Sequence, residues 1–242
     1  MGQTVVTAPG VDVELEIPPS EEDLNEKYVS VVGYIPGQGA EMGMDDEVIL
    51  VSAYYDGLGV GPDGVLYQGV NDNLSAVATM LELARVLKEG PYAPDKTIVF
   101  VAWAGGERWE TFSVASAMGA KIGFDRLNVE AVLELSGVGG GSGDAIAIGP
   151  GTSFRLSRLI EAAARRMGVS VTTRGKGPHY GLPTSTGFAE RKALSAFLTW
   201  DGSDAYSHTV DDTLANIEPE KLEALGRTMA LVLTVLSRER TY

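Results

Sequence analysis

Strand-like runs separated by stretches of helical spacing constrain the fold of this chain more than any other feature. Each run is too short for a buried helix and is rich in valine, isoleucine, leucine and aromatic residues, which is typical of strands. The first run alternates, and the others are apolar almost throughout, as expected for strands that are buried on both faces. The runs are Tyr28–Tyr34, Val48–Ala53, Thr97–Trp103, Val129–Leu135 and Ala193–Trp200.

Helical patterns lie between and after these runs. Apolar residues recur at helical spacing over Leu74–Leu87 and over Phe154–Met167, and a last helix begins at Pro219. Strands that alternate with helices predict an α/β fold, in which a mainly parallel mixed sheet is sandwiched between helices in three layers.

Length and composition indicate a single hydrophobic core. The chain has 242 residues, of which 44% are hydrophobic, and this length fits one α/β domain better than two. Residues 1–26 are polar and acidic, and we expect them to form an N-terminal arm or an edge element. We expect residues 27–242 to form the single domain.

The charge balance excludes several classes of partner. With 19 basic and 33 acidic residues the net charge is 19 − 33 = −14, so the surface lacks the cations that neutralise nucleic-acid phosphates or anionic lipids. The longest apolar helical stretch, Met229–Leu236, is too short to span a bilayer, and residues 1–30 show no signal-peptide pattern. The chain has no cysteine, which excludes disulfides and thiolate ligands. Nothing in the sequence specifies an oligomeric state.

Chemically active side chains follow several of the predicted strands. Asp56 comes after the second strand, Glu107 after the third, Glu134 stands at the end of the fourth and His208 lies beyond the fifth. Because the carboxyl ends of parallel strands meet at one edge of a sheet, these side chains are expected to converge there.

Each candidate also has a purely structural interpretation. Asp72, within Asn71-Asp72-Asn73, could cap the helix that begins near Leu74. Glu134 lies in an apolar strand, where an unpaired carboxylate is costly to bury, so it needs a metal, a cation, hydrogen-bond donors or a strand end open to water. A lone histidine in a loop, such as His208, is usually a surface residue.

Carboxylates combined with an imidazole are the ligands of a catalytic zinc site. Zinc accepts carboxylate oxygen and imidazole nitrogen, and a catalytic site leaves one position open for water. A neighbouring glutamate takes the proton from that water. The combination of Asp72, Glu107, Glu134 and His208 is therefore more informative than any one of them.

Five segments resemble a known family in their order along the chain. They are Val31–Gly37, Val51–Asp56, Gly69–Asn73, Phe100–Glu107 and Ser207–Thr213. The chain resembles the zinc-dependent exopeptidase family that includes secreted bacterial leucine aminopeptidases, glutamate carboxypeptidase, glutaminyl cyclase, nicastrin and the transferrin receptor ectodomain. This resemblance implies an aminopeptidase-like α/β fold, a peptide or protein ligand and an extracytoplasmic location.

The resemblance also implies roles for the candidate residues. The Asp72 position bridges two metal ions in the family, the His208 position binds one ion, and the Glu134 position, usually aspartate, binds the other. Asp56 matches the acid that orients the first histidine ligand. Here Tyr54 stands in place of that histidine. Tyrosine binds a metal only as phenolate, which its ordinary pKa of about 10 makes costly at neutral pH.

A second departure concerns two consecutive glutamates that follow the third strand in the family, a general base and then a metal ligand. This chain reads Gly106-Glu107-Arg108 there. Without a gap, which we favour, Gly106 takes the place of the base and Glu107 that of the ligand. With a one-residue insertion Glu107 becomes the base, and the guanidinium of Arg108 opposes a cation at the ligand position. In either register one of the two carboxylates is lost.

The sequence thus predicts a degenerate site that holds at most one zinc ion, or none. Loss of a general base typically lowers a rate by about 10² to 10⁴. We expect an impaired or inactive peptidase that binds or scaffolds a peptide or protein. The alternative is an active mono-zinc aminopeptidase-like hydrolase that acts on small peptides. His179 is a candidate for the substrate loop, although Thr184–Phe188 fits the same family motif and a surface-loop role for His179 is favoured.

Overall fold

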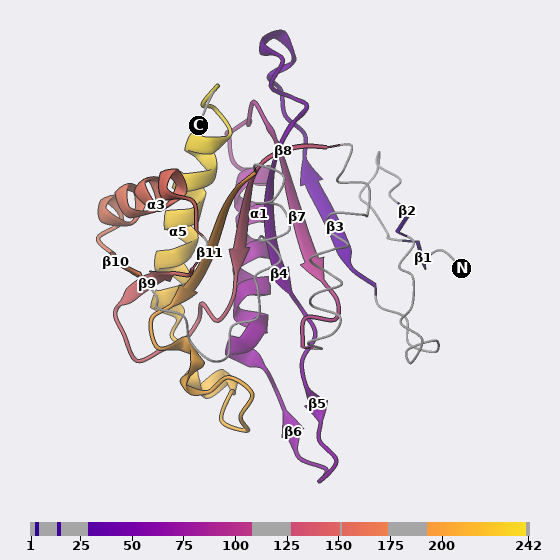
Figure 1. The fold of residues 1–242 in the computed structure, drawn as a ribbon, viewed down its shortest axis with the longest axis vertical. Helices are drawn as coiled ribbons and strands as arrows, with labels where there is room; N and C mark the ends of the chain where they lie inside the picture. The colour runs from indigo at the N-terminus through magenta and orange to yellow at the C-terminus, as the bar shows by residue number, and fades with distance from the viewer. Residues whose placement is uncertain are drawn as a thin grey trace.

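The computed structural model describes residues 29–107, 127–150, 152–173 and 193–240, together with the backbone of residues 3–4 and 14–15. Its centre is a seven-stranded sheet with the order β10-β9-β11-β8-β4-β7-β3 (Figure 1). The strands of this sheet are β3 (Val31–Ile35), β4 (Glu47–Tyr54), β7 (Thr97–Trp103), β8 (Asn128–Leu135), β9 (Ala145–Ile148), β10 (Ser170–Thr173) and β11 (Leu194–Trp200).

The pairing of the strands confirms the prediction of a mainly parallel mixed sheet. The central strands β7, β4, β8 and β11 run parallel, as β9 and β10 do, whereas β3 is antiparallel to β7 and β9 is antiparallel to β11. The carboxyl ends of the four central strands therefore share one edge, which is the lower edge in Figure 1.

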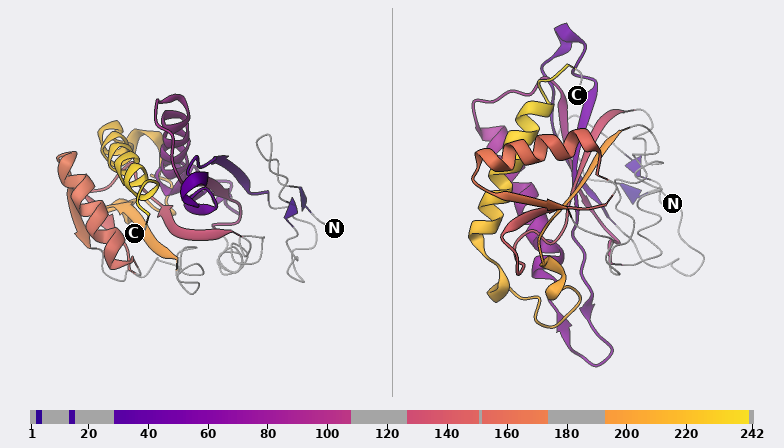
Figure 2. Two further views of the ribbon diagram at one scale, coloured as in Figure 1. Left: turned by 90° about the horizontal axis from the view of Figure 1, so that it is seen from above. Right: turned by 60° about the vertical axis from the view of Figure 1, so that its left-hand side comes forward.

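Three described helices cover one face of the sheet (Figure 2). They are α1 (Ala76–Glu89), α3 (Phe154–Arg166) and α5 (Pro219–Leu236). Alternate residues of the central strands, such as Ile49, Val51 and Leu133, pack with the apolar faces of these helices in the main core. The intervening residues form a smaller cluster on the other face, with Val48, Leu50, Val101 and Val132 among its members. No helix in the described part of the chain is long and apolar enough to cross a membrane.

Short elements complete the described chain. They are β1 (Gln3–Thr4) and β2 (Glu14–Leu15), which pair with each other, the hairpin strands β5 (Gly59–Val60) and β6 (Leu66–Tyr67), the irregular helical turn η2 (Val70–Ser75), and the 3-10 turns η1 (Ala40–Met42), η4 (Ser203–Ala205) and η5 (Leu214–Asn216). The remainder of the expected arm 1–26 lies outside the described residues.

A buried lysine ties the amino ends of three neighbouring strands together. Lys96, which precedes β7, has no exposed side-chain surface, and its ammonium lies 2.9 Å from Glu47 at the start of β4. The same ammonium forms an ion pair with Glu130 of β8. The two carboxylates are partly exposed, so the lysine is the only fully buried member of this group.

Lys96→Met is expected to lower the free energy of unfolding by about 2 kcal/mol, because it leaves Glu47 and Glu130 close together without their shared cation. Chemical denaturation would measure the change. Lys88→Met, at an exposed position of α1, is the matched control and should change stability by less than about 0.5 kcal/mol. Equal stability of the two variants would contradict a structural role for Lys96.

Candidate functional site

Three predicted site residues converge at the carboxyl edge of the sheet. The possible ligand atoms of Asp72, Glu107 and His208 all lie within 4.8 Å of one another. His208 Nε2 is 2.9 Å from Glu107 Oε2 and 3.8 Å from Asp72 Oδ2. Together with Leu58, Tyr67 and neighbouring residues they line a small cavity of about 10 Å³. The three residues come from separate loops, which follow β6, β7 and β11.

This geometry fits a single ion. Four ligands at about 2.1 Å from a tetrahedral zinc ion lie about 3.4 Å from one another. The separations of 2.9 and 3.8 Å bracket that value. Two carboxylates and one imidazole also match the donor types that zinc prefers. The residues present therefore fit one zinc ion, with a fourth position left for a water molecule or a ligand.

Tyr54, at the end of β4, directs its hydroxyl group at the same aspartate. The phenol donates a hydrogen bond to Asp72 Oδ1. Burial, followed by the nearby charges of Asp72 and Glu107, raises the pKa of Tyr54 well above its ordinary value. A phenol held neutral in this way is a hydrogen-bond donor and a poor metal ligand. Tyr54 therefore satisfies one oxygen of Asp72 that a second cation would otherwise contact.

Tyr54 and Gly106, two positions at which the sequence predicts departures from the family pattern, are in close contact. A Cβ atom built on Gly106 would lie 2.3 Å from Cγ and 2.4 Å from Cβ of Tyr54. Real Cβ contacts are not that short, so the present path of the loop after β7 requires glycine at this position. A glutamate cannot occupy position 106 unless the loop or β4 moves.

Asp56 holds the loop that carries Glu107. Its two carboxylate oxygens accept the backbone amides of Gly106, at 2.7 Å, and of Glu107, at 3.0 Å. Sequence reasoning predicted Asp56 as the acid that orients a histidine ligand. With Tyr54 in place of that histidine, the described contacts of Asp56 position the loop backbone, and Asp56 is not one of the three converging residues.

Asp212 fixes the loop that carries Asp72. Its side chain accepts the backbone amides of Asn71, at 2.6 Å, and of Asp72, at 2.9 Å, and only 1% of Asp212 is exposed. Ser207 donates its hydroxyl hydrogen to Asp72 Oδ2. The segment Ser207–Asp212 thus contributes His208, orients the Asp72 carboxylate and holds its backbone.

Asn71 and Asn73, on either side of Asp72, bind the loop that follows β8. The side-chain oxygen of Asn71 accepts the amide of Gly139, and that of Asn73 accepts the amide of Gly137. Asn73 also donates to the backbone carbonyl of Tyr54. Helix α1 begins at Ala76 without a side-chain cap, so the interpretation of this triplet as a helix cap is wrong. The triplet lies within the irregular turn η2, before α1, and its polar groups make contacts between loops.

Burial and hydrogen bonding shift the two groups that pair directly. Burial raises the pKa of Glu107, against the opposing effect of its hydrogen bond with His208. That hydrogen bond is the main cause of the raised pKa of His208. In the metal-free site Glu107 and His208 each keep a proton to a higher pH than usual. A metal ion that binds to these side chains has to displace those protons.

Glu134 is the one other predicted metal ligand among the described residues. Glu134 is buried in β8 beside Ser52 and Phe197, on the sheet face opposite the described helices. It does not belong to the converging group found among the described residues. Arg108 and His179 lie outside the residues that the structure describes, as does Thr184–Phe188.

The sequence alone did not indicate the roles of Ser207 and Asp212. Asp212 entered the sequence analysis only as part of the segment Ser207–Thr213, yet it contacts residues 140 or more positions away. The available signal was an acid four positions after a candidate ligand within Ser207–Thr213.

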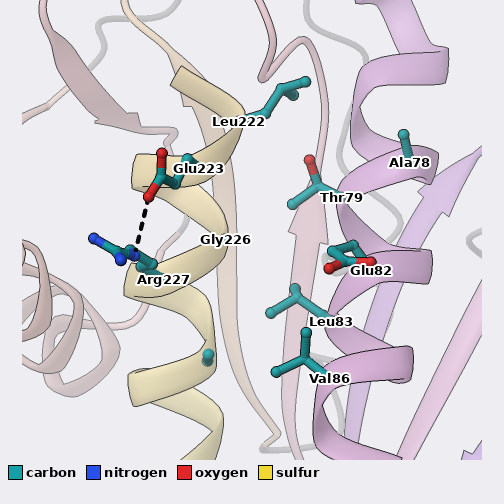
Figure 3. Close-up of a pocket in the computed structure, with 10 residues that line it drawn as sticks. Ala78, Thr79, Glu82, Leu83, Val86, Leu222, Glu223, Gly226 and Arg227 are labelled. Carbon is teal, nitrogen blue, oxygen red and sulfur yellow. Dashed lines mark ion pairs between the residues drawn. The ribbon is translucent and has the colours of Figure 1, made fainter. Parts of the chain in front are cut away.

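A larger hollow lies far from this chemistry. A groove of about 400 Å³ runs between α1 and α5 and is lined mainly by apolar side chains, with Glu82, Glu223 and Arg227 at its rim (Figure 3). It contains no residue of the converging group. This groove is therefore separate from the small cavity that Asp72, Glu107 and His208 line.

Fold and site together define an aminopeptidase-like α/β domain. The sequence profile of peptidase family M28 matches residues 30–233, which is 233 − 30 + 1 = 204 of the 242 residues. The chain belongs to peptidase family M28. The predictions of the family and of its fold are thereby confirmed.

Individual relatives agree with this assignment. The chain is 26% identical to aminopeptidase YwaD of Bacillus subtilis (strain 168) over 213 residues, covering 80% of this chain and 42% of that protein. The chain thus spans less than half of its relative. The LapA aminopeptidase of Legionella pneumophila has a TM-score of 0.72 at 20% identity, covering 87% of this chain and 55% of LapA. A glutaminyl cyclase from an Acidobacteriales bacterium has a TM-score of 0.67 at 18% identity, covering 98% and 78% of the two chains. These structural likenesses show the fold alone.

Proposed function

We propose that this M28 domain binds peptides at a site holding one zinc ion on Asp72, Glu107 and His208, and that it hydrolyses peptide bonds very weakly or not at all. Zinc and peptide ligands are suggested by the family and by the names of its members, such as the zinc aminopeptidase of Bacillus subtilis. The number of ions and the level of activity are our inference from the site. An extracytoplasmic location remains a prediction.

The observation that carries the proposal is the number of side chains that can serve as metal ligands or as the general base. A catalytic zinc site needs three protein ligands and, for peptide hydrolysis, a base beside the open position. The described residues bring together three metal-binding side chains and no fourth. If Glu107 binds the ion, no carboxylate of the group remains as the base. If Glu107 is the base, only Asp72 and His208 hold the ion.

Tyr54 supports a single ion. Its hydroxyl group donates to Asp72 Oδ1, so the aspartate is left with one oxygen for metal and that oxygen also accepts from Ser207. A zinc ion on the three residues would act as a Lewis acid toward the carbonyl oxygen of a bound peptide. The protein groups then orient this ion and hold the peptide, and Ser207 and Asp212 keep Asp72 in place.

Metal binding is the first test. Isothermal titration of metal-free protein with zinc should give one equivalent, and Asp72→Ala and His208→Ala should each abolish that binding, because two remaining ligands hold zinc weakly. Metal analysis after zinc soaking is the independent measurement. Less than about a tenth of an equivalent would overturn the zinc site, and two equivalents would overturn the single-ion assignment.

Activity distinguishes the proposal from its alternative, an active mono-zinc hydrolase of small peptides. We expect zinc-loaded protein to release no aminoacyl-anilide product above the level of Asp72→Ala. Turnover that disappears both with a chelator and in Asp72→Ala would establish the alternative instead.

A further inference from the structure

The β5–β6 hairpin extends from the rim of the candidate site. Leu58 and Tyr67, at its base, line the same cavity as Asp72, Glu107 and His208. Two views show both strands projecting past the end of the sheet, away from the described helices (Figures 1 and 2). The sequence between Gly57 and Gly69 is rich in glycine, which is typical of a loop. The structure instead places a two-stranded ribbon next to the metal-binding residues.

One face of this ribbon is apolar and exposed. Val60 and Leu66 are directly opposite each other in the pairing of the two strands, so their side chains share a face. Leu58, which precedes β5, is an exposed apolar residue at the base of the hairpin. These side chains are 44% (Leu58), 65% (Val60) and 57% (Leu66) exposed. A cluster of exposed apolar side chains next to a site is a typical interaction surface.

The edges of the ribbon are short, with two residues in each strand, and their paired positions carry neither a charged side chain nor a proline. Natural edge strands avoid pairing through charged side chains, prolines or bulges. Between residues 58 and 67 the only charge is Asp63 and the only proline is Pro62, and both lie in the turn outside the paired positions. Asp63 is engaged locally, since its carboxylate accepts the amide of Val65. A two-stranded hairpin is also only marginally stable in water, and a third strand stabilises it.

We propose that an extended peptide adds to an edge of the β5–β6 hairpin as a third strand and that its amino end reaches the cavity at Asp72, Glu107 and His208. This inference rests on the proposed peptide-binding function and assigns a surface to it. Strand addition supplies backbone hydrogen bonds, and alternate apolar side chains of the peptide would extend the face of Val60 and Leu66.

Charge and continuity favour a peptide as the occupant. A zinc ion on Asp72, Glu107 and His208 would offset the two carboxylate charges, and its open position would accept the nitrogen of a free amino end. A second copy of this chain is disfavoured because both copies carry a net charge of −14. The hairpin base lines the cavity directly, so a strand paired along the hairpin leads to the three residues.

The test uses a labelled decapeptide of alternating valine and threonine with a free amino end. Fluorescence anisotropy would measure its affinity for zinc-loaded protein, and hydrogen exchange would locate it. We expect slower amide exchange within residues 58–67 and about tenfold weaker binding to Val60→Thr/Leu66→Thr, because threonine preserves the strand but removes the apolar pair. Leu81→Thr removes a similarly exposed leucine, 62% accessible on α1, and should bind as wild type does.

Zinc titration of each variant distinguishes a failure of the hairpin proposal from a failure of the proposed zinc site. Unchanged zinc binding and unfolding midpoint in Val60→Thr/Leu66→Thr, with weaker peptide binding, support the hairpin. Equal peptide affinity in that variant and wild type, or protection confined to other segments, overturns the hairpin and leaves the proposed function intact. A zinc-loaded wild-type protein that binds no peptide overturns peptide binding itself. A wild-type dimer that becomes monomeric in the variant identifies a second copy as the occupant and also overturns the inference.

Discussion

Asp212→Ala is expected to lower the free energy of unfolding by about 3 kcal/mol. The buried carboxylate accepts the backbone amides of Asn71 and Asp72, and its removal leaves both donors without an acceptor. Hydrogen bonds to a charged group contribute about 1.5 to 3 kcal/mol each, and the two share one acceptor group. Urea denaturation followed by circular dichroism would measure the loss. Zinc affinity should fall at least about tenfold, because Asp72 is no longer held.

The neighbouring Asp211 provides a matched control. Its side chain is exposed, and its described hydrogen bonds use the backbone, whose carbonyl oxygen accepts Thr213 N and Asn216 Nδ2. Asp211→Ala removes the same charge one residue away and should change stability by less than about 0.5 kcal/mol. Similar stability and similar zinc affinity of the two variants would show that Asp212 does not hold the Asp72 loop.

Gly106→Ala is expected to destabilise the protein by about 3 kcal/mol, at the upper end of the range for overpacking. The new Cβ would lie 2.3 Å from Cγ of Tyr54, so the loop or the end of β4 has to shift. The backbone amide of Glu107, in the same loop, donates to Asp56. A shift of this loop would move the Glu107 carboxylate relative to His208. Zinc affinity should therefore fall by about tenfold to a hundredfold.

Gly57→Ala is the control for this substitution. A Cβ built on Gly57 meets nothing within 4 Å, and Gly57 lies in the loop directly after Asp56. The control should retain both stability and zinc affinity, as measured by thermal unfolding and calorimetry. Unchanged zinc affinity in Gly106→Ala would mean that the loop tolerates a side chain, and the steric account of position 106 would be wrong.

The central strands were predictable because their burial is visible in the sequence. The strand β7 spans Thr97–Trp103, the predicted range, and β4 extends the predicted Val48–Ala53 by one residue at each end. Both strands are covered on both faces, so their residues are apolar almost throughout. The family assignment also followed from the sequence, since five motifs recur in order.

The sheet edges and the hairpin were not predictable in the same way. The strand β9 (Ala145–Ile148) follows a glycine-rich run, and β10 (Ser170–Thr173) is exposed at both ends, so neither shows a distinct strand pattern. The strands β5 and β6 have two residues each, which is too short for any periodicity. Short elements are defined by their partners, and pairing partners are not visible in a local pattern.

The candidate site was predictable in its residue types but not in its contacts. The convergence of Asp72, Glu107 and His208 agrees with the expected carboxyl edge. The hydrogen bonds of Tyr54 and Ser207 to Asp72 depend on side-chain positions that spacing along the chain does not determine. Substitutions at a family's ligand positions therefore indicate a loss of ligands, whereas the structure shows which groups replace them.

The tight approach of Gly106 to Tyr54 bears on how this domain could have changed over time. A Cβ atom at position 106 would lie 2.4 Å from the Cβ of residue 54. An ancestor with glutamate at position 106 would therefore have needed a different path of this loop. Every residue except glycine has a Cβ at position 54, so histidine would not reopen the space. Reversion at position 106 alone is therefore sterically blocked. A glutamate at position 106 requires a new backbone route between Trp103 and Glu107.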